Sequence, residues 1–182
     1  MINHNYLIDK SWCNSGGSCD VMPIKDCPDL VFKSFRYKHK AKEAYNNQLK
    51  LSKLNLAPKV LSNLCQIAYY FDPKILEFWN PKTTTTGWGY ITEMAYLLDE
   101  QDKPHQLLQN LVNEIYDKTK LKFWDCHLEN VGYIKRKHKK ILVCIDTGKE
   151  SFDSSSDAWG LGKPGPECYY CNGYICSCRE DV

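Results

Sequence analysis

The spacing of apolar residues predicts strands and one helix in the first half of the chain. "LVFKSF" (30–35) and "QIAYYF" (66–71) have the short apolar runs of strands, and "GYITEMAYLL" (89–98) predicts a third. Between the first two, apolar residues recur at a spacing near 3.6 from Lys38 to Leu56, which predicts an amphipathic helix ended by Pro58.

The second half predicts a helix followed by a hairpin. Residues 104–119 begin with a proline suited to a first turn and place apolar residues on one face, at Leu107, Leu108, Leu111, Val112 and Ile115. "VGYI" and "ILVCID" (141–146) flank the basic run "KRKHKK" (135–140), which favours a hairpin with a solvated tip. Strands with one helix, then a helix with a hairpin, indicate an α+β fold.

Composition narrows the class of protein. The 43% hydrophobic and 25% charged residues are those of a soluble globular protein, and a net charge of +2 gives no global field that would attract nucleic acid or an anionic membrane. The N-terminus has no signal-peptide pattern and no segment has the apolar length of a membrane span, so we expect a cytoplasmic protein without a membrane partner. In that compartment the ten cysteines are expected to be reduced thiols.

Several residue types needed for phosphoryl transfer follow one another along the chain. A glycine-bearing turn (Gly16, Gly17) precedes a strand lysine (Lys33), and an acid and an amide in "DCHLEN" precede "IDTG" (145–148). Phosphoryl transfer needs a flexible turn over the phosphates, a cation on them, an acid that orients the attacking hydroxyl, and oxygen ligands for Mg²⁺. The chain offers each of these.

These residues resemble the protein-kinase-like superfamily, over about residues 12 to 150. Its catalytic loop has Asp and, five positions later, Asn, which are Asp125 and Asn130 here. His127 matches the form common in aminoglycoside-phosphotransferase-like kinases, where most protein kinases have Lys. "DTG", beginning at Asp146, looks like the metal-binding "DFG" triplet on the second strand of a hairpin.

The resemblance implies a role for each matching residue. Asp125 would be the catalytic acid/base, His127 would contact the γ-phosphate, and Asn130 and Asp146 would hold Mg²⁺. Lys33 would bind the α- and β-phosphates of ATP beneath the Gly16–Gly17 turn. "YITEMA" resembles the hinge, so Glu93 and Ala95 would meet adenine through their backbones, with Thr92 as gatekeeper.

Other features depart from the family pattern. Glu43 is the candidate partner of Lys33, but the family position of that Glu falls near Asn47, one helical turn later, so Glu43 is either the ion-pair partner or a solvated residue. Phe123 and Trp124 replace the family's His and Arg, and only 34 residues follow Gly148, without the helical half of the C-terminal lobe. The three-glycine loop pattern is also missing.

The tail and the basic run have two readings each. Cys168, Cys171, Cys176 and Cys178 could form a structural Zn²⁺ site, although the last spacing is tight, and the alternative is a tail with free thiols. The run 135–140 is a nucleic-acid patch or a charged hairpin tip, and we favour the tip. Nucleic acid is therefore not an expected partner.

We expect a two-lobed, protein-kinase-like α+β fold. An N-lobe with an antiparallel sheet and one helix (1–95) would precede a truncated, mainly helical C-lobe (96–150) and a Cys-rich tail (151–182). The expected function is an ATP- and Mg²⁺-dependent kinase acting on a hydroxyl, with Ser/Thr of a protein as the favoured acceptor. The alternatives are a pseudokinase-like binding module without transfer and a kinase of small hydroxyl compounds.

Overall fold

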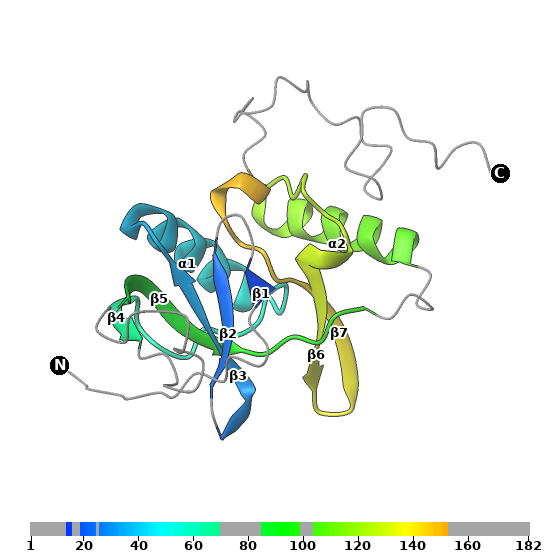
Figure 1. Cartoon of the computed structure of the whole chain (residues 1–182). Coiled ribbons are helices and arrows are strands. Elements are labelled where there is room, and N and C mark those ends of the chain that lie inside the picture. The colour runs from blue at the N-terminus through cyan, green and yellow to red at the C-terminus, as the bar shows by residue number, and fades with distance from the viewer. Residues whose placement is uncertain (1–13, 16–18, 25, 70–84, 99–103, 153–182) are drawn as a thin grey trace. The chain divides into compact units, whose positions relative to one another are not determined.

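The chain folds into a mixed α+β structure, as expected. The structure is a computed structural model that describes residues 14–15, 19–24, 26–69, 85–98 and 104–152 (Figure 1). Its described part contains an antiparallel sheet, two α-helices and a separate hairpin. Neither of the described helices is long and apolar enough to cross a membrane.

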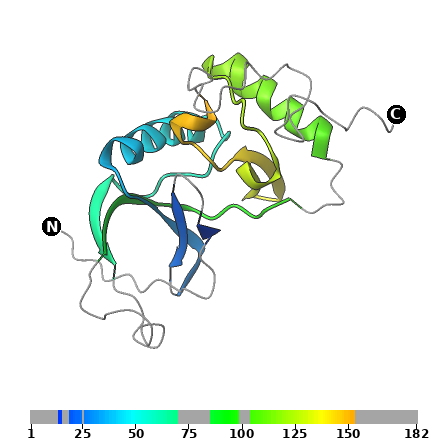
Figure 2. The ribbon, with the colours of Figure 1, turned by 45° about the horizontal axis from the view of Figure 1, so that its top comes forward.

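The larger sheet has five antiparallel strands in the order β1-β2-β3-β5-β4, which can be followed in Figure 2. The strands are β1 (Asn14–Ser15), β2 (Asp20–Ile24), β3 (Cys27–Phe35), β4 (Cys65–Tyr69) and β5 (Thr85–Glu93). Gly89 of β5 lies opposite Ser34 of β3, and a Cβ there would come within 2.0 Å of the carbonyl oxygen of Lys33. Glycine therefore permits the close approach of these two central strands.

The strand predicted over 89–98 is wrong at both ends, because β5 begins at Thr85 and ends at Glu93. Its last residues pair with the loop after α1: Glu93 donates its backbone N–H to the carbonyl of Lys59 at 2.9 Å. The prediction extended to Leu98 because residues 94–98 are mostly apolar. These residues are not all buried, since Leu97 is half exposed.

Helix α1 (Lys38–Ser52) is shorter than predicted, whereas α2 (Pro104–Thr119) has the predicted bounds. Instead of continuing to Leu56, the chain turns at Asn55, whose φ of 57° is left-handed. Asparagine tolerates this conformation better than most residues, so it ends the helical region before Pro58 is reached. The continued apolar spacing reflects burial of Leu56 in a core, not a further helical turn.

The predicted basic-tipped hairpin is confirmed. Strands β6 (Val131–Arg136) and β7 (Lys139–Cys144) pair from Val131 with Cys144 to Arg136 with Lys139, and Lys137 and His138 make the turn. A short 3-10 helix, Leu128–Asn130, precedes β6, and another, Lys149–Ser151, follows β7.

The chain divides into two compact units. Unit 1 comprises Met1–Asn46 and Lys59–Met94, and unit 2 comprises Asn47–Pro58 and Ala95–Val182. Unit 1 packs Phe35, Ala41, Ala44 and Tyr90 into one core cluster. The core cluster of unit 2 draws on α1, α2 and the hairpin, with Leu51, Leu108, Ile115, Phe123 and Val131 among its buried members. The end of α1 thus belongs to unit 2, which the expected division at residue 95 did not foresee.

Candidate functional site

The segment between α2 and β6 is fixed by buried side chains on either side of its polar ones. Phe123 and Cys126 are 1% and 2% exposed, and the Phe123 ring stacks on Phe152 with centroids 5.2 Å apart. Asp125 and His127 keep 24% and 20% of their side-chain surface exposed. The buried Phe123 and Cys126 therefore hold the two polar side chains at the surface of a packed core.

Asn130 connects this segment to the far strand of the hairpin. Its side-chain Nδ2 donates to the backbone oxygen of Asp125 and to Asp125 Oδ2, both at 2.9 Å. Its backbone oxygen accepts the N–H groups of Ile145 at 2.9 Å and of Asp146 at 3.4 Å. One residue thus positions both acids.

Asp146 lies in a turn just beyond β7, because that strand ends at Cys144 and not at Asp146 as expected. Asp146 Oδ1 accepts the backbone N–H of Gly148 at 2.9 Å, a bond typical of an Asx turn. The thiol of Cys144 donates to the Asp146 carbonyl at 2.8 Å. The other carboxylate oxygen of Asp146, Oδ2, takes no part in these hydrogen bonds.

The surroundings of Asp125 shift its pKa in opposite directions. Burial raises the pKa of Asp125 above its ordinary value, and the Asp146 carboxylate raises it further. His127, whose Nε2 lies 3.6 Å from Asp125 Oδ1, lowers that pKa, as does the Asn130 hydrogen bond. Because the Asp146 carboxylate disfavours the ionised form of Asp125, a cation beside these two side chains would be favoured.

The neighbouring cysteine is not a candidate nucleophile. Burial, with a smaller contribution from the Asp125 charge, raises the pKa of Cys126 to about 12. Since the thiolate is the reactive form, Cys126 is an inert core thiol.

The residues present fit a bound Mg²⁺ ion. Asn130 Oδ1 accepts no hydrogen bond from the described residues, so this oxygen and the Asp146 carboxylate are two oxygen atoms on linked segments that could ligate a cation. Mg²⁺ is usually held by one or two protein oxygens together with phosphates and water. Within the described ranges no group of three or more His, Cys, Asp or Glu could hold a metal, so a closed all-protein cage is not formed there.

Sequence reasoning missed the residues that connect α1 to the turn at Asp146. Asn47 Nδ2 donates to the backbone oxygen of Thr147 at 3.2 Å, and Thr147 Oγ1 donates to Gln48 Oε1 at 3.4 Å. Gln48 is fully buried and also donates to the Pro58 carbonyl at 3.0 Å. The available signal was Gln48 itself, a polar residue on the same helix face as Ala44 and Leu51.

The candidate residues of unit 1 occupy the sheet and α1. Lys33 is 4% exposed and lies between Val21 of β2 and Tyr90 of β5. Glu43 is partly exposed and, among the residues that the structure describes, forms no ion pair with Lys33. The solvated alternative for Glu43 is therefore the one observed.

The segment that resembles a hinge is ordered by the loop after α1. Thr92 is 1% exposed and donates its hydroxyl to the Lys59 carbonyl at 2.9 Å. Glu93 Oε2 accepts the Lys59 N–H at 3.2 Å. The boundary between the two units falls between Met94 and Ala95, inside the predicted hinge.

Five predicted ligand groups lie outside the described residues, namely the Gly16–Gly17 turn and Cys168, Cys171, Cys176 and Cys178. The glycine loop and the zinc site stay predictions.

No protein-family model, curated protein or solved structure matches this chain. The case for its function therefore depends on the geometry of Asp125, Asn130 and Asp146.

Proposed function

We propose that this protein is an ATP- and Mg²⁺-dependent phosphotransferase with a protein-kinase-like fold, transferring the γ-phosphate to a hydroxyl. The observation that carries the proposal is the double role of Asn130, which binds Asp125 through its amide and Asp146 through its backbone carbonyl. This arrangement joins a carboxylate suited to orient a hydroxyl to a pair of metal ligands. Such positioning accounts for most of the catalysis in this class of reaction.

Each residue has a defined task in this proposal. Asp125 accepts the hydroxyl proton and orients the attacking oxygen, and His127 contacts the γ-phosphate. Asn130 and Asp146 hold Mg²⁺, which when bound neutralises phosphate charge. Its charge also offsets the repulsion between Asp125 and Asp146, which favours the ionised form of Asp125 that the reaction needs.

Three features of the described chain support the kinase-like fold. The five-stranded sheet is antiparallel and has α1 inserted between β3 and β4. Hairpin β6–β7 links the Asp125 segment to Asp146, and the unit boundary falls in the hinge-like segment. Ser/Thr of a protein is the favoured acceptor, with a small hydroxyl compound as the alternative suggested by His127.

The test is phosphate transfer from [γ-³²P]ATP, with ADP release as a readout that needs no known acceptor. Asp125→Asn removes the proton acceptor, so we expect a loss of roughly 10²- to 10⁴-fold in rate. Asp117→Asn is the matched control, since Asp117 is exposed on α2, and it should leave the rate unchanged. Equal rates for Asp125→Asn and the parent protein would refute the catalytic role.

A nucleotide-binding module without transfer is the second candidate. It is favoured by Glu43, which forms no ion pair with Lys33 in the described part of the chain. Nucleotide binding by the parent protein without ADP release or labelled product would select this candidate over the enzyme.

A further inference from the structure

The outer edge of β7 carries backbone groups that form no hydrogen bond within the described chain. Tyr133 of β6 exchanges both backbone hydrogen bonds with Tyr96, at 2.8 and 2.6 Å, so its N–H and C=O point away from β7. Leu142 lies opposite Tyr133, and the two therefore form a non-hydrogen-bonded pair, in which the backbone groups of both strands point outward. Lys140, two residues from Leu142, has the same orientation.

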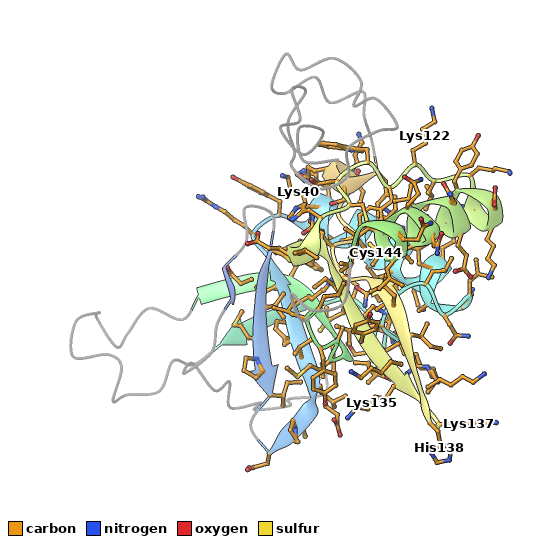
Figure 3. All side chains as sticks on the ribbon, turned by 90° about the vertical axis from the view of Figure 1, so that its right-hand side faces the viewer. Lys40, Lys122, Lys135, Lys137, His138 and Cys144 are labelled. Atoms are coloured by element: carbon orange, nitrogen blue, oxygen red, sulfur yellow. The ribbon has the colours of Figure 1, made fainter. Side chains whose placement is uncertain are left out.

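A hydrogen bond at the other end of β7 agrees with this orientation. The N–H of Cys144 points outward and donates to the carbonyl of Leu56 at 2.9 Å. Leu142 and Lys140 precede Cys144 at intervals of two, yet their outward N–H and C=O groups form no hydrogen bond with any described residue. In Figure 3, Lys137 marks the turn of the hairpin and Cys144 its opposite end. We call residues 140–142 of β7 the open edge.

Two lysines lie directly opposite each other beside the open edge. Lys135 and Lys140 are exposed, and neither forms an ion pair with a described residue. Lys135 Nζ lies 5.2 Å from the centre of the Tyr96 ring, and Lys140 Nζ lies 5.5 Å from that of Tyr133. Because like charges directly opposite each other destabilise a strand pair, a negative charge next to Lys140 would be favoured.

We propose that the open edge binds an extended acidic segment of a partner protein, which adds to β7 as an antiparallel strand. Lys140 and Leu142 offer two outward donors and two outward acceptors, and the backbone of an extended peptide complements both kinds of group. A segment with the pattern apolar-apolar-acidic-acidic fits the side chains. Its apolar residues would lie beside the partly buried Leu142 and Ile141, and its acids beside the exposed Lys140 and Lys139.

Other ligands fit the open edge less well. The phosphates of nucleic acids and lipids accept hydrogen bonds but do not donate them, so they would leave the outward carbonyls of Lys140 and Leu142 unpaired. A second copy of this chain would bring lysines to lysines, and lysines on an edge strand are a common protection against such self-pairing. An acidic segment reduces the repulsion between Lys135 and Lys140. This inference is independent of the phosphotransferase proposal.

Amide hydrogen exchange of the full chain, followed by NMR, tests the proposal on the parent protein. The probe is a synthetic peptide with Val-Val-Glu-Glu at its centre, added at about 1 mM. Without peptide, the amides of Lys140 and Leu142 should exchange fast, whereas that of Ile141 should be protected by its pairing with Ile134. The peptide should slow exchange at Lys140 and Leu142 by roughly tenfold or more and leave Ile141 unchanged. Unchanged exchange at Lys140 and Leu142 would overturn the proposal.

Two N-methylated peptides separate strand addition from simple attraction between charges. Methylation of the first Glu removes the N–H that would donate to the Lys140 carbonyl, so the Kd should rise by about tenfold or more. Methylation of the second Val alters an N–H that would point away from β7, so the Kd should stay within about twofold of that of the unmodified peptide. Equal Kd values for the two methylated peptides would contradict strand addition.

Two substitutions of one lysine give the matching test on the protein side. Lys140→Gln removes the charge and should weaken peptide binding about two- to fivefold at low salt. Lys140→Pro removes the same charge and also the outward N–H, which the pairing with β6 does not use, so it should bind roughly tenfold more weakly than Lys140→Gln. Protection of the Ile141 amide in Lys140→Pro shows that the hairpin is formed, and the methylated peptides need no substitution at all. The proposal fails if the two variants bind equally, or if single-stranded DNA competes as well as unlabelled peptide.

Discussion

The two ends of hairpin β6–β7 carry opposite chemistry. At one end, which we call the root, Asp125, Asn130 and Asp146 are joined by hydrogen bonds beside a packed core. At the other end, the basic tip (Lys135, Arg136, Lys137, Lys139 and Lys140) places the exposed Lys135 and Lys140 directly opposite one another. The same pair of strands therefore carries an ordered acidic site at one end and a cluster of basic residues at the other.

The root and the tip differ in the interactions that hold their polar side chains in place. At the root, donors and acceptors satisfy one another, so the geometry exists before a ligand arrives and a ligand meets prepared oxygens. At the tip, order comes from the strand pairing and from the tyrosines below the lysines, while the charges themselves oppose it. We expect substitutions at the root to cost stability and substitutions at the tip to cost little or to gain some.

Removing the main anchor of the root should have the largest effect. Phe123→Ala deletes a ring that is 1% exposed and stacked on Phe152, so we expect a loss of about 3–5 kcal/mol in the free energy of unfolding. Leu54→Ala, at a position 37% exposed, is the control and should change stability by less than about 0.5 kcal/mol. Urea denaturation followed by circular dichroism measures both, and similar losses would show that Phe123 is not an anchor.

A smaller effect is expected on the ionisation of one carboxyl. Asp146→Asn should lower the pKa of Asp125 in the metal-free protein, because the Asp146 charge raises it, and His127→Gln should raise it, because His127 lowers it. Since the folded pKa of Asp125 lies above its ordinary value, its contribution to stability decreases as pH rises from that value through the folded pKa. Carboxyl ¹³C NMR titration reads the two shifts, and shifts in the same direction would contradict the arrangement of charges.

Breaking the hydrogen bond between α1 and the turn at Asp146 should cost less stability. Asn47→Ala removes the bond to the Thr147 carbonyl, and we expect it to be about 0.5–1.5 kcal/mol less stable than Asn46→Ala. Asn46 is the exposed neighbour on the same helix, so both variants share the gain in helix propensity that Ala brings. Equal unfolding midpoints for the two variants would mean that this hydrogen bond does not stabilise the turn.

The smallest effect, of opposite sign, is expected at the tip. Lys140→Glu converts the repulsive pair with Lys135 into an attractive one and should stabilise the protein by about 0.2–1 kcal/mol at low salt. Lys122→Glu makes the same charge change at an exposed position outside the hairpin. A thermal shift equal in the two variants would assign the gain to overall charge, and no gain in Lys140→Glu would contradict repulsion between Lys135 and Lys140.

Much of the local structure could be predicted from the spacing of apolar residues. The helical spacing over 104–119 predicted α2, and the basic run 135–140 between two apolar runs predicted the hairpin. Both predictions are correct because the apolar residues of these elements are the ones that the fold buries. The end of α1 was missed since Asn55 takes a left-handed conformation while Leu56 stays buried. The spacing of apolar residues alone does not distinguish a further helical turn from a buried residue in the loop that follows.

The candidate site was predictable in its members but not in its bonds. The five-residue interval placed Asp125 and Asn130 together, yet only the fold shows that Asn130 also binds the backbone of Asp146. The contribution of Asn47 and Gln48 depends on contacts about a hundred residues apart in the chain, which periodicity does not report. Long-range polar contacts were therefore the main omission.

The central claim is that the root of the hairpin binds a metal together with nucleotide phosphates. Isothermal titration with ATP, in Mg²⁺ or in excess EDTA, tests it most directly on the parent protein and on Asp146→Asn. We predict that Mg²⁺ strengthens ATP binding by the parent at least tenfold and that Asp146→Asn loses this gain. The same Mg²⁺ dependence in both proteins, or ATP binding by the parent that does not respond to Mg²⁺, would contradict the account.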